Sequence, residues 1–145
     1  FEARFIELAG QVNSYMPTHV CNKAAEALNQ AGKSVKGSKV IILGMAYKRN
    51  IDDERESPAL DIMDELDRKS ADLSYIDPYI TSVEIGGRSY HSLEFTPEVL
   101  AGSDLVIIVT DHDAFDYGMI LEKAPLILDT RNAIKDRKSK KVWRL

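Results

Sequence analysis

Two runs of apolar, mostly β-branched residues constrain the fold more than any other feature of the chain. They occupy residues 39–43 and 105–109 and carry almost no polar side chain, which is typical of parallel strands buried on both faces of a sheet. Shorter strand patterns at 72–76, 126–128 and 142–143 alternate with segments of helical periodicity. This alternation predicts a mostly parallel sheet with right-handed crossovers and helices on both faces.

Local start signals mark the helices. Ser57 with Pro58, and Thr96 with Pro97, have the residue types of an N-cap followed by a first helical position. The apolar stripe near the start of the chain is interrupted by Pro17, so we expect two helices there, or one that is kinked. The predicted fold class is therefore α/β, a Rossmann-like three-layer αβα sandwich preceded by a helical lead-in.

Composition narrows the class of protein. The chain has 145 residues, 44% of them hydrophobic, which suits one globular domain, and we place the helical lead-in at 1–34 and the Rossmann-like domain at 35–145. A net charge of −4 without a basic face argues against a nucleic-acid partner. No apolar run approaches the roughly 20 residues of a membrane span, so no membrane partner is expected. A single cysteine, Cys21, fits a reducing cytoplasm and core packing.

The connection after the strand at 39–43 is long and charged. It covers residues 44–57 and holds seven charged side chains, whereas such connections usually take about two to six residues. It leaves the edge of the sheet where α/β folds bind ligands. Because only Gly44 of a phosphate-binding glycine motif is present, Lys48 and Arg55 are the groups that would hold an anion, by charge. Charge-rich loops that are merely solvated are common, so that alternative stays open.

Two other polar clusters follow predicted strands. They lie at 110–112 and 129–132, and therefore at the same edge of the sheet as the charged loop. Together, Lys48, Arg55 and Arg131 predict a crevice for an anionic ligand.

Other polar residues have simpler interpretations. Asp77 ends a strand where an NAD-binding domain keeps an acid for ribose, but it lies 33 residues after Gly44 rather than about 20. A turn-forming role is therefore preferred. His19, His91 and His112 have no partner at metal-ligand spacing, so no metal site is predicted. His112 is a candidate ligand contact by position only.

Five segments together resemble a known family. They are 39–48, 52–58, 75–79, 104–110 and 129–132. In this order they resemble the C-terminal domain of the UDP-glucose/GDP-mannose dehydrogenases. The lead-in is most similar to the branch that oxidises UDP-N-acetylhexosamines. The resemblance covers nearly the whole chain.

The resemblance implies the UDP-sugar-binding domain of an NAD-dependent 6-dehydrogenase, which oxidises C6 of the sugar from alcohol to carboxylate through a cysteine-bound thioester. Cys21 does not match that nucleophile's motif, and the chain starts in what looks like the middle of a helix. We therefore expect a piece of a longer protein that binds without catalysing. Its expected partners are the UDP-sugar, an N-terminal domain that holds most of the NAD contacts, and a second copy in a full-length homodimer.

The resemblance also implies roles for individual residues. Tyr47, Lys48 and Arg131 are the implied substrate contacts. Arg55 is implied to face the NAD side of the interdomain cleft. The implied supporting residues are Gly44, Asp53, Glu56 and Ser57.

Three alternatives remain. Within the family, UDP-glucose or GDP-mannose could be the substrate. Outside it, the chain could be a nucleotide-binding module without catalysis. A self-sufficient NAD-binding domain is disfavoured by the missing glycines.

Overall fold

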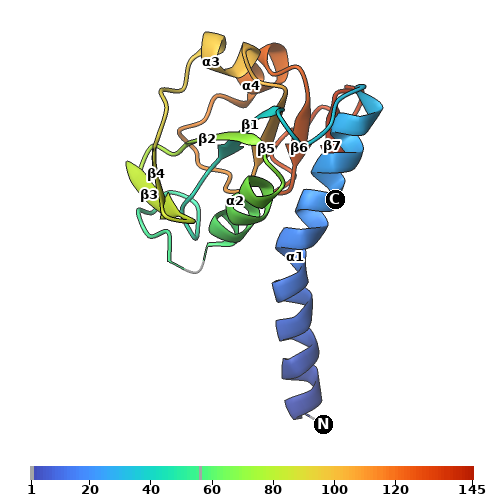
Figure 1. Ribbon diagram of the computed structural model, residues 1–145, viewed down its shortest axis with the longest axis vertical. Coiled ribbons are helices and arrows are strands. Elements are labelled where there is room, and N and C mark those ends of the chain that lie inside the picture. Colours follow the sequence, from blue (N-terminus) through green and yellow to red (C-terminus); the bar gives the residue numbers. More distant parts are fainter. Residues whose placement is uncertain (1, 56) are drawn as a thin grey trace.

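A five-stranded parallel sheet forms the centre of the computed structural model, which describes residues 2–55 and 57–145, with side chains from residue 14 onward (Figure 1). The strand order is β2-β1-β5-β6-β7 and every neighbouring pair is parallel, while β3 and β4 form a separate antiparallel hairpin. This confirms the predicted Rossmann-like α/β fold. The elements, in chain order, are α1 (Glu2–Gln30), β1 (Lys39–Leu43), α2 (Pro58–Arg68), β2 (Asp72–Ile76), β3 (Ser82–Ile85), β4 (Arg88–His91), α3 (Pro97–Ala101), β5 (Leu105–Ile108), α4 (Tyr117–Lys123), β6 (Ile127–Asp129) and β7 (Val142–Arg144).

Successive residues of the central strands alternate between the two faces of the sheet. In β1, Val40 and Ile42 join the core under α1 and α2, whereas Ile41 and Leu43 join the core under α3 and α4. A strand that is apolar on both faces needs a cover on each of them. The β-branched composition of the strands therefore requires the two helical layers.

The helical lead-in is one helix, because α1 runs through Pro17. Of the two alternatives expected from the sequence, the structure has the single helix and not two separate helices. A proline inside a helix costs about 3 kcal/mol, but burying one Val or Leu side chain contributes about 1.5–3 kcal/mol. The second half of α1 buries a whole stripe, so packing outweighs the interruption. The stripe consists of Val20, Cys21, Ala24, Ala27 and Leu28.

Two consequences follow from this packing. Cys21 is fully buried in the core, as predicted, and burial raises the pKa of its thiol. The second half of α1 also shares the hydrophobic core with the sheet, so the division into 1–34 and 35–145 stays a prediction. Among the described residues, no helix combines the length and the apolar character needed to cross a membrane.

The order in which successive strands are added across the sheet reverses at β1. β1 is followed by β2 on one side and pairs with β5 on the other, so the carboxyl ends of β1 and β5 lie at the switch point where such folds bind ligands. The loop after β1 ends at α2, where Ser57 is the N-cap and accepts a 3.2 Å hydrogen bond from the N–H of Ala59. Pro58 is the first helical residue. Both helix-start predictions for this loop are confirmed.

Candidate functional site

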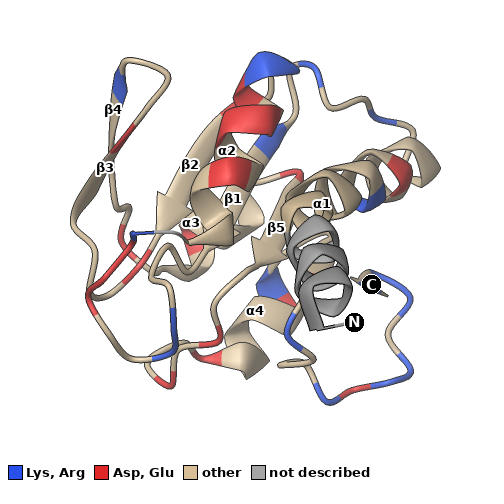
Figure 2. Cartoon of the chain, turned by 90° about the horizontal axis from the view of Figure 1, so that it is seen from below, with Lys and Arg blue, Asp and Glu red and all other residues tan. Residues whose placement is uncertain are grey.

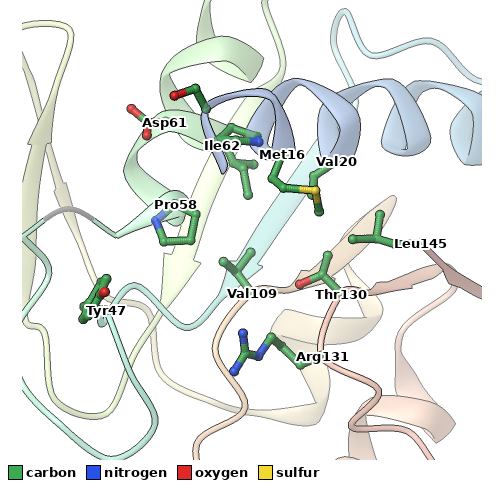
Figure 3. Close-up of a pocket in the computed structure, with 12 residues that line it drawn as sticks. Met16, Val20, Tyr47, Pro58, Asp61, Ile62, Val109, Thr130, Arg131 and Leu145 are labelled. Atoms are coloured by element: carbon green, nitrogen blue, oxygen red, sulfur yellow. The ribbon is translucent and has the colours of Figure 1, made fainter. Parts of the chain in front are cut away.

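A pocket of about 710 Å³ opens at the carboxyl ends of the sheet strands. Small-molecule sites commonly have volumes of about 300–1,000 Å³. The walls come from the loop after β1, the first turn of α2, the ends of β5 and β6, and the middle of α1. The lining is mixed: Met16, Val20 and Val109 are apolar, while Asp61 and Arg131 supply charge (Figure 3). A ligand here would meet apolar side chains, one guanidinium and one carboxylate.

The pocket brings together two of the predicted substrate contacts. Tyr47 and Arg131 both line it, although they are far apart in the sequence. Lys48 is not a lining residue, but its Nζ lies 5.7 Å from the centroid of the Tyr47 ring, within cation–π range. The structure therefore places Lys48 beside the pocket, next to a side chain that lines it.

Asp111, which follows β5 closely, contacts two arginines. Its Oδ2 accepts a 2.9 Å hydrogen bond from Nη2 of Arg49, and its Oδ1 lies 3.5 Å from Nε of Arg131. The hydrogen bond to Asp111 raises the pKa of the Arg49 guanidinium. The contact to Arg131 uses Nε, and one terminal nitrogen of that side chain points toward Val109 (Figure 3). The ion pair with Asp111 therefore leaves the terminal nitrogens of Arg131 available.

Arg55 is not brought into this pocket. Its Nε and Nη2 donate to the two carboxylate oxygens of Asp53 at 3.0 and 2.9 Å. These hydrogen bonds hold the pKa of Asp53 at about 2. The Arg55 side chain is 84% exposed, away from the lining residues. Glu56 lies outside the described residues, so its supporting role stays a prediction.

Gly44 sets the path of the loop as it leaves β1. Its φ is +93°, and a Cβ there would lie 2.5 Å from the Cβ of Thr110. In the same place the hydroxyl of Thr110 donates a 2.7 Å hydrogen bond to the carbonyl of Ala46. Only glycine permits this close approach, since other side chains rarely adopt positive φ. The ends of β1 and β5 are thereby locked together directly before Tyr47.

Basic and acidic residues are interspersed on the loops at this edge (Figure 2). No group of three or more His, Cys, Asp or Glu residues within the described part of the chain could hold a metal ion.

Two further predictions can be compared with the structure. Asp77 accepts hydrogen bonds from the N–H groups of Tyr79 and Ile80 at 2.7 and 3.1 Å, which confirms its turn-forming role. His112 is fully buried and does not line the pocket. The prediction that His112 contacts a ligand is therefore wrong, because the loop after β1 covers it.

Sequence reasoning missed the wall that α1 contributes. Val20 belongs to the predicted helix stripe and Pro17 to its interruption, and no local pattern indicates that Met16, Pro17 and Val20 line a cavity. The role of Arg49 was also missed. Its position directly after Lys48, at the same edge as Asp111, was the available signal.

The comparisons with known proteins agree on one family. The family model described as the UDP binding domain of the UDP-glucose/GDP-mannose dehydrogenase family matches residues 41–136. The matched region contains the end of β1, all of β5 and β6, and both Tyr47 and Arg131 of the pocket.

Individual relatives resemble the chain over nearly its whole length. A UDP-N-acetyl-D-mannosamine dehydrogenase of Methanococcus maripaludis is 33% identical over 147 residues, covering 96% of this chain and 33% of the relative. A UDP-glucose 6-dehydrogenase of Rickettsia bellii is 29% identical over 144 residues, with 92% and 32% covered. The structure of a UDP-D-ManNAc dehydrogenase from Pyrococcus horikoshii superimposes with a TM-score of 0.77 at 29% identity, covering 96% and 32%. The chain therefore spans about a third of the length of these relatives.

Proposed function

Because the chain belongs to the UDP-glucose/GDP-mannose dehydrogenase family, we propose that it is the UDP-sugar-binding part of an NAD-dependent nucleotide-sugar 6-dehydrogenase. The complete enzyme oxidises the C6 alcohol of the sugar to a carboxylate. A UDP-N-acetylhexosamine is the proposed substrate, supported by relatives named UDP-N-acetyl-D-mannosamine dehydrogenase. A relative named UDP-glucose 6-dehydrogenase makes UDP-glucose the second candidate.

One observation carries this proposal: Tyr47 and Arg131 line one pocket, and Lys48 lies beside it. A guanidinium binds phosphate through two parallel hydrogen bonds, while an ammonium acts as a mobile point charge. In the proposed complex Arg131 and Lys48 hold the anionic part of the nucleotide sugar, and the ring of Tyr47 packs against it. This part of the enzyme would bind and orient the nucleotide sugar, and NAD, when bound to the complete enzyme, would supply the hydride acceptor.

NAD itself is proposed to be held mainly by a domain outside this chain. The Asp77 carboxylate, at the strand end where such domains keep a ribose ligand, is completely buried and already bonded to backbone N–H groups. It therefore does not fit a ribose-binding role. Arg55, exposed on the charged loop, is proposed to reach the NAD side of the cleft between the domains.

The test of nucleotide binding is calorimetry with UDP and NAD on this chain. UDP should bind more tightly than NAD. Lys48→Ala should weaken UDP binding by about one to two decades, because a charge-assisted hydrogen bond contributes about 1.5–3 kcal/mol. Lys33→Ala is the matched control, since Lys33 pairs with Asp104 at the opposite edge of the sheet. Equal UDP affinity for wild type and Lys48→Ala, or a preference for NAD, would contradict the assignment.

The helical lead-in has its own proposed role. We infer that residues 1–34 are the end of a central region through which two full-length subunits associate. The burial of the second half of α1 against the sheet supports a rigid connection between this region and the nucleotide-binding part. Sedimentation of the full-length protein should give a dimer. A full-length monomer that retains activity would rule this role out.

A further inference from the structure

A buried ionisable pair lies beneath the pocket-side loop and takes no part in lining the pocket. Nε2 of His112 lies 2.8 Å from Oδ2 of Asp77, and both side chains are 0% exposed. The two residues come from different strand ends, β2 and β5. Buried charged groups are costly unless fully paired, so such a pair at a binding edge calls for a role.

The hydrogen bonds of His112 assign its tautomer. The backbone N–H of Asn50 donates to Nδ1 of the imidazole at 2.8 Å. An N–H group can only donate, so Nδ1 carries no proton and Nε2 must carry one. Nε2 therefore donates to Asp77, and the pair consists of a neutral imidazole and a carboxylate.

The Asp77 carboxylate is fully satisfied. Its Oδ2 also accepts from the N–H groups of Met45 and Ala46 at 2.7 and 3.0 Å, and its Oδ1 accepts from two more backbone N–H groups after β2. Burial raises the pKa of Asp77, but the hydrogen bonds from His112 and the backbone outweigh it and the net pKa is lowered. The carboxylate therefore remains ionised and keeps all of these bonds.

Asp77 and His112 accept hydrogen bonds from the two ends of the short segment 45–50. Asp77 holds Met45 and Ala46 directly before Tyr47, and His112 holds Asn50 directly after Lys48 and Arg49. The segment between these anchors carries Tyr47, which lines the pocket, and Lys48, which lies next to it. Asn50 adopts a φ of +61°, which the hydrogen bond to His112 helps to maintain.

We propose that Asp77 and His112 are positioning residues that hold Tyr47 and Lys48 in the geometry required to bind the nucleotide. This inference rests on the proposed function for the identity of the ligand. The ordering of the segment can be measured without any ligand.

Two conservative variants separate the two bonds of His112. In His112→Gln the side-chain amide can replace Nε2 as donor to Asp77, but the acceptor for Asn50 is lost. In His112→Asn the amide oxygen can replace Nδ1 as acceptor for Asn50, but the donor to Asp77 is lost. His112→Gln should therefore speed hydrogen exchange of the Asn50 amide, and His112→Asn should largely restore its protection.

Binding should follow the same order. Loss of one net hydrogen bond corresponds to about a 2- to 10-fold change in an equilibrium constant. The dissociation constant for UDP should therefore rise by about that factor in His112→Gln, and by less in His112→Asn. Nitrogen NMR of the wild-type imidazole should show a proton on Nε2 and none on Nδ1.

Asp104→Asn is the matched control for general loss of stability. Asp104 also holds a backbone N–H, that of Lys39 at 2.7 Å, but at the opposite edge of the sheet. It should leave exchange of the Asn50 amide and UDP affinity unchanged. The inference is overturned if this variant affects the segment as strongly as His112→Gln, or if His112→Gln leaves Asn50 exchange unchanged.

The two proposals can fail separately. If Lys48→Ala weakens UDP binding but His112→Gln does not, the positioning role is wrong and the proposed function stands. If the wild-type chain binds no UDP while Asn50 exchange responds as predicted, the proposed function fails and the ordering of the segment by the pair is supported.

Discussion

The two edges of the sheet use charge in different ways. At the amino edge, before β1 and β5, Lys33 pairs with Asp104, and the same carboxylate accepts from the N–H of Lys39. One cation meets one anion there. At the carboxyl edge, a single carboxylate, Asp111, serves both Arg49 and Arg131. The first arrangement ties the chain together, whereas in the second two arginines share one carboxylate and one of them, Arg131, also lines the pocket.

The largest difference between the two edges is expected in the loss of stability caused by a glycine-to-alanine substitution. Gly44→Ala should destabilise the fold by about 3 kcal/mol or more, because positive φ and a clash with the backbone of Thr110 act together. Gly37→Ala, at the amino edge, has a φ of +81° but nothing within 4 Å of a new Cβ, so about 1–2 kcal/mol is expected. Urea unfolding of the two variants checks this. Equal losses would mean that the ends of β1 and β5 are not locked together.

Removal of one cation from each edge should have unequal effects on binding. Arg131→Ala should weaken UDP binding about 10- to 100-fold, since a charge-assisted bond is worth about 1.5–3 kcal/mol. Lys33→Ala should leave the affinity unchanged, because its partner Asp104 lies at the far edge. Calorimetry measures both. A comparable loss of UDP affinity in Lys33→Ala would mean that the substitutions act by destabilising the fold and not by removing a contact in the pocket.

Low pH should reduce the stability of the fold because it protonates Asp77 at the carboxyl edge. Its pKa in the folded state is below the ordinary value of 3.8, so its contribution to stability is present above that value and is lost as the pH falls through the lower, folded-state pKa. The free energy of unfolding should decrease from about pH 4 downward. Asp77→Asn should show a shallower decrease, measured by urea unfolding across this pH range. Identical slopes would exclude Asp77 as a source of the acid sensitivity.

The smallest effect is expected for Asp111→Asn. It keeps the size of the side chain but removes the charge that faces Arg49 and Arg131. Partly exposed ion pairs contribute about 0.2–1 kcal/mol, so UDP affinity should change only a few-fold. Calorimetry at low and high salt would detect this. A loss as large as that of Arg131→Ala would mean that Asp111 itself contacts the ligand.

Local signals predicted the elements well. Ser57 and Thr96 are N-caps as expected. The strands β1 and β5 lie where the two apolar runs predicted strands. The resemblance to the dehydrogenase family is confirmed by the match over residues 41–136. The caps and strands depend on residues that are neighbours in the sequence. The family resemblance depends on five segments that follow one another in a fixed order along the chain.

Long-range contacts were not predicted in this way. Pro17 suggested a break, but packing of the following stripe kept α1 whole. His112 is a candidate ligand contact by its position in the sequence, but in the structure it is buried and bonded to the loop after β1. Its bonds to Asp77 and Asn50 join residues 35 and 62 positions away, and no local pattern encodes such a pairing.

The sequence by itself determined the order of strands and helices, the edge at which polar residues gather, and the family. Periodicity and capping act over a few residues, so they can be recognised without the fold. Only the tertiary structure decided which of those polar residues line the pocket, as Arg131 does, and which are buried, as Asp77 and His112 are. That choice depends on how close the ends of β1, β2 and β5 come to one another, and sheet packing sets this distance.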